Sequence, residues 1–167
     1  MSTFVSVGNS TDPFPRLLSA VCEVANQLPM PVFVQYGAAQ VFSCPSCTGV
    51  AFLEMGEFEQ RINEADLLIL HAGAGSVINA IRAGKIPVVM PRRAGFGELV
   101  DDHQMEFARE LEKVGKVSVA HDAASLMHAV ELAMQRQKLA TDKVINDSPL
   151  VAMVRNILAE ESLKAGV

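Results

Sequence analysis

One stretch, from Ala65 to Ile78, constrains the fold more than any other part of the chain. The apolar run at residues 67–70 predicts a short buried strand, and a turn of small residues follows it, His71-Ala72-Gly73-Ala74-Gly75-Ser76. We expect a helix to begin in this turn, where its first N–H groups lack partners and the helix dipole is positive. Because glycine has no Cβ, the two glycines let a ligand approach the backbone closely. The stretch therefore predicts a site for a nucleotide diphosphate.

The rest of the chain alternates between predicted strands and predicted helices. Apolar runs predict strands at residues 3–7, 32–35, 50–53, 67–70, 86–90 and 116–119. Helical spacing of apolar residues predicts helices at 14–28, 57–64, 76–83, about 102–114 and from 122 onward. This alternation is typical of a doubly wound, Rossmann-like α/β sheet of about six parallel strands, order 3-2-1-4-5-6, with helices on both faces.

The predicted domain organisation is one α/β domain followed by a short C-terminal extension. We expect residues 1–135 to form the nucleotide-binding domain, since 167 residues suffice for one such domain but not comfortably for two. Residues 136–167 are expected to form a loose connection and a last helix, starting at Pro149, that packs on the domain or on a partner. The apolar stripe of that helix contains Leu150, Met153, Val154, Ile157 and Leu158.

Composition excludes several classes of protein. A net charge of -5 and the lack of a basic run argue against nucleic-acid binding. No apolar run approaches the roughly 18 residues that span a bilayer, and the first residues do not resemble a signal peptide, so we expect a cytoplasmic protein without membrane insertion. The odd count of three cysteines predicts no disulfide framework. Cys44 and Cys47 are interpreted as loop thiols, and Cys22 as a helical residue without a partner.

Two familiar nucleotide motifs do not fit. A dinucleotide fingerprint would need a glycine at Ile78 and an acidic residue about twenty positions further on, where the chain has Arg92 and Arg93 instead. A P-loop is excluded because no Gly-Lys-Ser or Gly-Lys-Thr occurs. The two arginines themselves fit either a charged loop or a contact with an anionic sugar, a lipid phosphate or a partner.

The glycine turn, together with Gly84-Lys85-Ile86-Pro87 and Asp102-His103-Gln104, resembles the donor-binding domain of family 28 glycosyltransferases. Within that family it is most similar to the small soluble subunits of two-component UDP-sugar transferases, both eukaryotic dolichol-linked and bacterial exopolysaccharide ones. The resemblance implies one lobe of the two-lobed GT-B fold. It also implies an inverting hexosyltransferase that needs no metal or cofactor. Such a subunit acts on a lipid-linked saccharide as a heterodimer with a membrane-associated, acceptor-binding subunit, at the inner face of the membrane.

The resemblance assigns roles to individual positions. Backbone N–H groups at residues 73–76 would bind the UDP diphosphate, so that a helix N-terminus neutralises the leaving group in place of a metal. The full donor-binding set is Gly8, Phe52, Met55, His71, Gly73, Ala74, Gly75, Ser76, Asn79, Arg93, His103 and Gln104. The general base is not identified: His71 and Asp12 are candidates, and the resemblance places the base on the other lobe.

Two departures from the family pattern leave alternatives open. Asn79 stands where relatives carry an acidic residue that binds the ribose hydroxyls, and Asn9 stands where they usually carry threonine. An asparagine hydrogen-bonds without the assistance of a charge, which predicts weaker donor binding. The alternatives are a non-catalytic module that binds a nucleotide sugar, and a small homodimeric nucleotide-sugar hydrolase.

Overall fold

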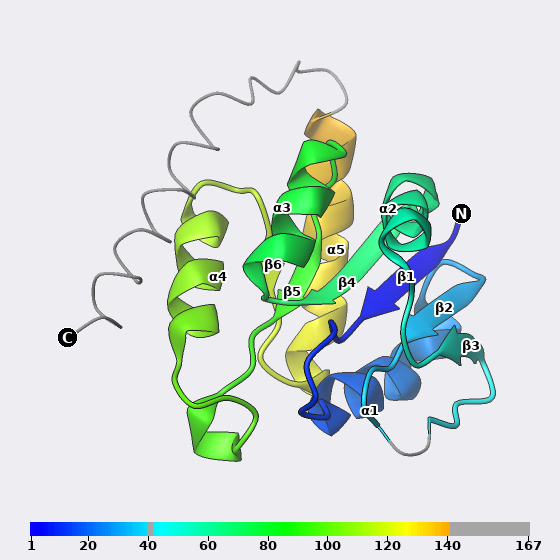
Figure 1. The fold of residues 1–167 in the computed structure, drawn as a ribbon. Helices are drawn as coiled ribbons and strands as arrows, with labels where there is room; N and C mark the ends of the chain where they lie inside the picture. Colours follow the sequence, from blue (N-terminus) through cyan, green and yellow to red (C-terminus); the bar gives the residue numbers. More distant parts are fainter. Residues whose placement is uncertain (40–41, 141–167) are drawn as a thin grey trace.

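A computed structural model of the chain describes residues 1–39 and 42–140. All strand pairs in its six-stranded sheet are parallel, and the order is β3-β2-β1-β4-β5-β6 (Figure 1). The strands are β1 Thr3–Ser6, β2 Val32–Gln35, β3 Cys47–Val50, β4 Leu67–His71, β5 Val88–Met90 and β6 Ser118–Val119. The predicted order is therefore confirmed, with its reversal between β1 and β4.

Helices cover both faces of the sheet (Figure 1). Helices α1 and α5 pack together on one face, and α2, α3 and α4 lie on the other. The α-helices are α1 Pro15–Val24, α2 Met55–Glu64, α3 Ala74–Arg82, α4 His103–Lys113 and α5 Ala123–Ala140; two short 3-10 helices are η1 Ala25–Gln27 and η2 Ala94–Phe96. The sheet is thus a central layer between two layers of helices.

Alternation along the strands explains why both faces are covered. On β1, Val5 belongs to the apolar cluster under α1 and α5, whereas its neighbour Phe4 belongs to the cluster under α2, α3 and α4. On β4, Ile69 and Leu70 divide between the clusters in the same way. Successive side chains of a strand point to opposite faces, so a strand that is apolar at every position needs cover on both sides.

Most predicted element boundaries differ from the structure by one or two residues, and three differ by more. Strand β3 occupies residues 47–50 rather than 50–53, because its partner β2 fixes the pairing and Val32 aligns with Cys47. The first helix ends as an α-helix at Val24 and continues only as η1. Residues 136–140, predicted as loose, are the last turn of α5. Tertiary contacts hold this turn: Arg136 donates to the Val117 carbonyl at 2.9 Å, and Gln137 bonds the backbone of residues 84 and 86.

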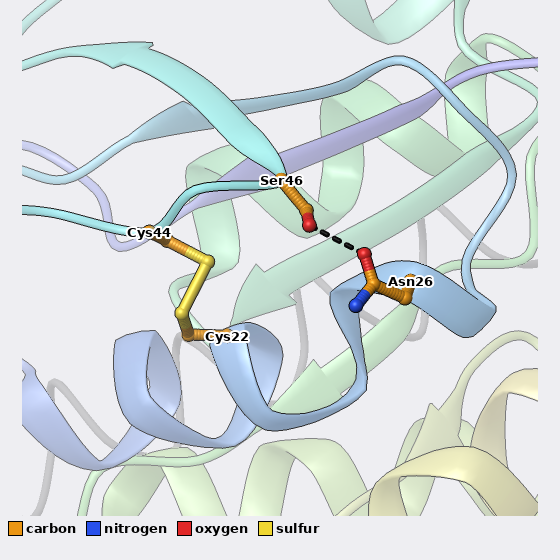
Figure 2. The surroundings of a disulfide bond; sticks show 4 residues. All are labelled: Cys22, Asn26, Cys44 and Ser46. Atoms are coloured by element: carbon orange, nitrogen blue, oxygen red, sulfur yellow. Dashed lines mark hydrogen bonds between the residues drawn. A yellow bond between two sulfur atoms is a disulfide. The ribbon is translucent and has the colours of Figure 1, made fainter.

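The cysteine prediction is wrong. Cys22 of α1 and Cys44 of the loop between β2 and β3 form a disulfide, with their Cα atoms 5.8 Å apart (Figure 2). Asn26 and Ser46 bond each other beside it. The spacing of the cysteines does not predict this disulfide, because Cys44 pairs with Cys22, which is distant in sequence, and not with Cys47 of the Cys-x-x-Cys pair. Cys47 is a free thiol, and burial raises its pKa.

The last predicted helix, from Pro149, and its apolar stripe lie outside the described residues. Among the residues that are described, no helix combines the length and the apolar character that crossing a bilayer requires.

Candidate functional site

A pocket of about 290 Å³ opens at the carboxyl ends of the strands. Residues that follow β1, β2, β3 and β4 line it, and the sheet order reverses between β1 and β4 at this place. Open parallel sheets bind ligands at such a reversal, outside the carboxyl ends of their strands. The lining consists of Gly8, Asn9, Gln35, Leu53, Met55, Phe58, His71, Gly73, Ala74, Gly75, Ser76 and Asn79.

The N-terminus of α3 forms one wall of the pocket. Gly73 is the N-cap, the first turn of the helix begins at Ala74 beside the pocket, and no side chain among the described residues caps it. The amide of Val77 bonds the Gly73 carbonyl, so the amides of the three residues between them precede the first helical bond. Uncapped first-turn amides and the positive end of the helix dipole suit a diphosphate.

His71 fills the space between two glycines at the base of the pocket. A Cβ added at Gly8 would lie 2.6 Å from the His71 Nε2 atom, and a Cβ added at Gly73 would lie 2.8 Å from its Cδ2 atom. Gly8 also has φ +81°, a conformation that side chains disfavour. The loop after β1 and the turn after β4 therefore approach the imidazole from both sides, and only residues without a Cβ permit this approach.

The imidazole of His71 is neutral at physiological pH. Burial lowers its pKa to about 4, and the positive charge of Arg92 lowers it in the same direction, while the backbone of Ser6 acts weakly against both. Its Nδ1 atom is buried and forms no hydrogen bond of standard geometry within the part of the chain that the structure describes. A neutral imidazole offers one donor and one acceptor, so His71 can contact a phosphate or a hydroxyl without prior protonation.

A chain of hydrogen bonds orders the loop after β1. The hydroxyl of Ser6 donates to the Gln35 Oε1 atom at 2.7 Å, and the Gln35 amide donates to the Asn9 Oδ1 atom at 2.7 Å. The backbone N–H of Gly8 donates to the same Ser6 hydroxyl. These bonds fix Asn9 at the pocket, where the family pattern has threonine. Gln35 was not predicted as a site residue, although its place at the end of β2 could have indicated it.

Apolar side chains from the segment around the start of α2 form another part of the pocket lining. Leu53, Met55 and Phe58 line it, and Met55 is 64% exposed. Asn79 of α3 completes this side. Phe52, which the resemblance to the family places near the uracil, lies outside the lining and is 52% exposed. Leu53, one residue further along, takes its place in the pocket wall.

The predicted residues on the loop after β5 and at the start of α4 also lie outside the lining. Gln104 is buried, and its Oε1 atom accepts the backbone N–H of Arg92 at 3.1 Å. His103 bonds Asp101, and Arg93 stacks over the Phe96 ring at 5.5 Å. The structure thus brings together Gly8, Met55, His71, residues 73–76 and Asn79, but not Phe52, Arg93, His103, Gln104 or the exposed Asp12.

A buried ion pair holds the loop after β5 against α1. Arg16 donates to both carboxylate oxygens of Glu98, at 2.9 and 2.7 Å, and also to the carbonyls of Pro91 and His121. Glu98 accepts the backbone N–H of Arg93 as well, and the bonds and charges of the arginines keep its pKa below the usual range despite burial. This bidentate pair was not found from the sequence, because its partners are 82 residues apart.

The chain matches a known protein family. The model of the glycosyltransferase family 28 C-terminal domain matches residues 3–155. The chain belongs to this family. The matched span includes every strand and the whole pocket lining, and the six-stranded order is that of one GT-B lobe.

Two kinds of relative are similar in sequence. A UDP-N-acetylglucosamine transferase subunit ALG13 from Yarrowia lipolytica is 35% identical over 112 residues, which cover 64% of this chain and 55% of that protein. The UDP-N-acetylglucosamine--N-acetylmuramyl-(pentapeptide) pyrophosphoryl-undecaprenol N-acetylglucosamine transferase of Acinetobacter baumannii is 29% identical over 147 residues, 83% of this chain and 35% of that one. The chain therefore spans about half or less of these relatives.

Solved glycosyltransferases share the fold at lower identity. The glycotransferase of kitacinnamycin superposes with a TM-score of 0.63 at 20% identity and covers 83% of this chain and 37% of that one. The calicheamicin glycosyltransferase CalG4 superposes with a TM-score of 0.60 at 17% identity, covering 95% and 43%. These similarities show that the chain has the fold of one lobe of a GT-B glycosyltransferase.

Proposed function

We propose that this family 28 domain is the donor-binding subunit of an inverting, metal-independent transferase of N-acetylglucosamine from UDP-N-acetylglucosamine. In this proposal it acts with a membrane-associated, acceptor-binding subunit on a lipid-linked saccharide. One observation carries the proposal: the uncapped N-terminus of α3 lines a pocket at the sheet reversal, between the glycine-flanked His71 and Asn79. That is the environment in which a nucleoside diphosphate can be both held and stabilised as a leaving group.

The chemistry assigned to the chain is stabilisation of the departing UDP. Transfer with inversion needs an acceptor hydroxyl, a general base and a way to stabilise the charge that develops on the diphosphate. The amides at residues 74–76 and the Ser76 hydroxyl supply donors for that charge. His71, neutral and aimed between the two loops, supplies a further contact to a phosphate or sugar oxygen. The base is assigned to the proposed acceptor-binding subunit, because exposed Asp12 does not line the pocket.

The nucleoside is expected along the apolar part of the lining. Leu53, Met55 and Phe58 offer an apolar surface to the uracil, and Asn79, in the second turn of α3, offers its amide to the ribose hydroxyls. This arrangement leaves the sugar near Gly8 and Asn9, on the side from which an acceptor would approach.

The sugar and the partner are proposed from the relatives. Both the Yarrowia and the Acinetobacter relatives are named as transferases of N-acetylglucosamine, and the Yarrowia protein is named as a subunit. The Acinetobacter name specifies an acceptor on pyrophosphoryl-undecaprenol, which supports a lipid-linked acceptor. The resemblance to exopolysaccharide subunits stays a prediction about the pathway.

Calorimetric titration of the full chain tests the donor site. We expect UDP and UDP-N-acetylglucosamine to bind, ADP to bind more weakly, and Ser76→Ala to weaken UDP binding. Failure of every uridine nucleotide to bind would contradict the proposal.

Turnover assays then separate the proposal from its alternatives. Transfer of labelled N-acetylglucosamine to a polyprenyl-diphosphate saccharide is expected only when the acceptor-binding subunit is added. Robust transfer by the chain alone would contradict the need for a partner. Binding without turnover in either sample favours the non-catalytic module, and UDP release without an acceptor favours the hydrolase.

A further inference from the structure

Arg92 is the largest fully buried side chain of the described residues, although a charged loop residue is normally exposed. Only 1% of its surface reaches solvent. Its guanidinium stacks 4.6 Å from the centre of the Phe14 ring, and arginine stays protonated even where burial lowers its pKa, as it does here. Burying a cation costs free energy unless hydrogen bonds and opposite charges compensate for the lost water, so the contacts of the guanidinium matter.

The guanidinium bonds both ends of the loop that follows β1. Its Nη2 atom donates to the Val7 carbonyl at 3.2 Å, directly before Gly8, and its Nη1 atom donates to the Pro13 carbonyl at 3.2 Å. The same Nη1 atom reaches the Glu98 carbonyl of the loop after β5 at 3.4 Å. One planar fork thus closes residues 8–12 into a loop of fixed span and ties it to the neighbouring loop.

We propose that Arg92 is a positioning residue for the donor site, which holds the loop of residues 8–12 over the imidazole of His71. This inference rests on the proposed function, since it names how that site keeps its shape. Gly8 lies at the start of this loop and touches the imidazole, so a shift of the loop changes the pocket directly. Arg92 itself does not line the pocket and acts through its neighbours.

The charge of Arg92 has a second effect, on His71. Arg92 is the charged group that acts on His71 among the described residues, and it opposes protonation of the imidazole. Asp12 and Glu98 act in turn on Arg92 and favour its charged form. Arg92 therefore holds the loop in place and adds to the effect of burial in keeping the imidazole under the loop neutral.

Two substitutions in the full chain separate these effects. Arg92→Met removes the fork and the charge, while Arg92→Lys keeps a charge but cannot reach three carbonyls at once. Arg136→Met is the matched control, because Arg136 also donates to a backbone carbonyl beside a strand, that of Val117 before β6, at the amino ends of the strands and away from the pocket. UDP affinity is measured by calorimetry, and the pKa of His71 and the amide resonances of the 8–12 loop by NMR.

We expect both Arg92 variants to weaken UDP binding by about tenfold or more, the scale of losing an outer-shell partner, and Arg136→Met to leave it unchanged. Arg92→Met should also raise the pKa of His71 above about 4, although burial, the larger cause of the shift, keeps it below the usual value; Arg92→Lys should keep it low. Unchanged UDP affinity in folded Arg92→Met would overturn the inference and leave the proposed function standing.

If the wild-type chain does not bind UDP, the proposed function fails, and the inference is decided by NMR alone. Loop resonances and a His71 pKa that do not move in Arg92→Met then overturn it. If Arg92→Met does not fold, Arg92→Lys decides the loop contact. A wild-type His71 that titrates near 6.5 refutes the effect of the charge without any variant.

Discussion

Substitution by alanine is predicted to change stability in opposite directions at Gly73 and at Gly75, the two glycines that follow β4. At Gly73 an added Cβ would lie 2.8 Å from the His71 Cδ2 atom, closer than such atoms are found in proteins. At Gly75 an added Cβ would meet nothing within 4 Å. Gly73 precedes the helix in an extended conformation, so the clash with the imidazole, not backbone strain, decides the effect there.

The magnitudes follow from these surroundings. Forcing a methyl group against a packed ring costs about 1–3 kcal/mol, so Gly73→Ala should lower the free energy of unfolding by that amount. Alanine replaces glycine inside a helix with a gain of about 0.5–1 kcal/mol, which applies to Gly75 in the first turn of α3. For a chain of this size the expected shifts in Tm are about 2–12 °C downward and about 1–4 °C upward.

Binding should fall in both variants, for different reasons. Gly73→Ala displaces His71, and Gly75→Ala places a methyl group where the diphosphate is proposed to approach the helix. Losing one hydrogen bond to a charged group costs about 1.5–3 kcal/mol, or roughly a 10- to 150-fold rise in Kd for UDP. Thermal melts and calorimetry measure both quantities. A Gly75→Ala variant that is more stable and binds UDP as wild type does would refute the close approach of a diphosphate.

Three further predictions concern other parts of the chain. The pKa of His71 is about 4 in the folded chain and about 6.5 in the unfolded chain, so the stability that the neutral imidazole contributes is fully present above pH 6.5 and falls by up to about 3 kcal/mol toward pH 4. His71→Gln should make the free energy of unfolding, measured by urea denaturation, less dependent on pH between 6.5 and 4. The same pH dependence in wild type and variant would contradict the assignment. The disulfide between Cys22 and Cys44 closes a loop of 22 residues, so Cys22→Ser should lower stability by about 3 kcal/mol, and a reductant should affect wild type but not the variant in thermal melts. Asn79→Glu should strengthen UDP binding about tenfold through charge-assisted bonds to the ribose; the same gain with 2′-deoxy-UDP would show that the ribose is not the target.

The sequence predicts the sheet and the pocket well because local patterns determine both. Unbroken apolar runs place the inner strands, and alternation with helices indicates a doubly wound sheet, for which the order 3-2-1-4-5-6 is common and determines which loops meet. The turn at residues 71–76 lies at the pocket because a strand end and a helix start are both readable there. The packing of His71 between Gly8 and Gly73 follows from that order, although the closeness of the contact does not.

What the sequence could not predict depends on partners distant along the chain. Strand β3 contains Gly49 and lies three residues earlier than its apolar run, because pairing with β2 decides its position. The last turn of α5 has polar side chains, yet Arg136 and Gln137 find backbone partners across the fold. Arg92 looks like a surface charge in sequence, and only the tertiary fold surrounds it with three carbonyls.

The contact of His71 with two glycines also limits how such a domain can change over generations. A side chain at Gly8 or Gly73 costs stability while the ring is in place, so substitutions at these three positions are not independent. A smaller residue at position 71 would remove this cost at position 73 but not at position 8, whose φ of +81° still favours glycine. Over evolution, we therefore expect position 71 to change before position 73.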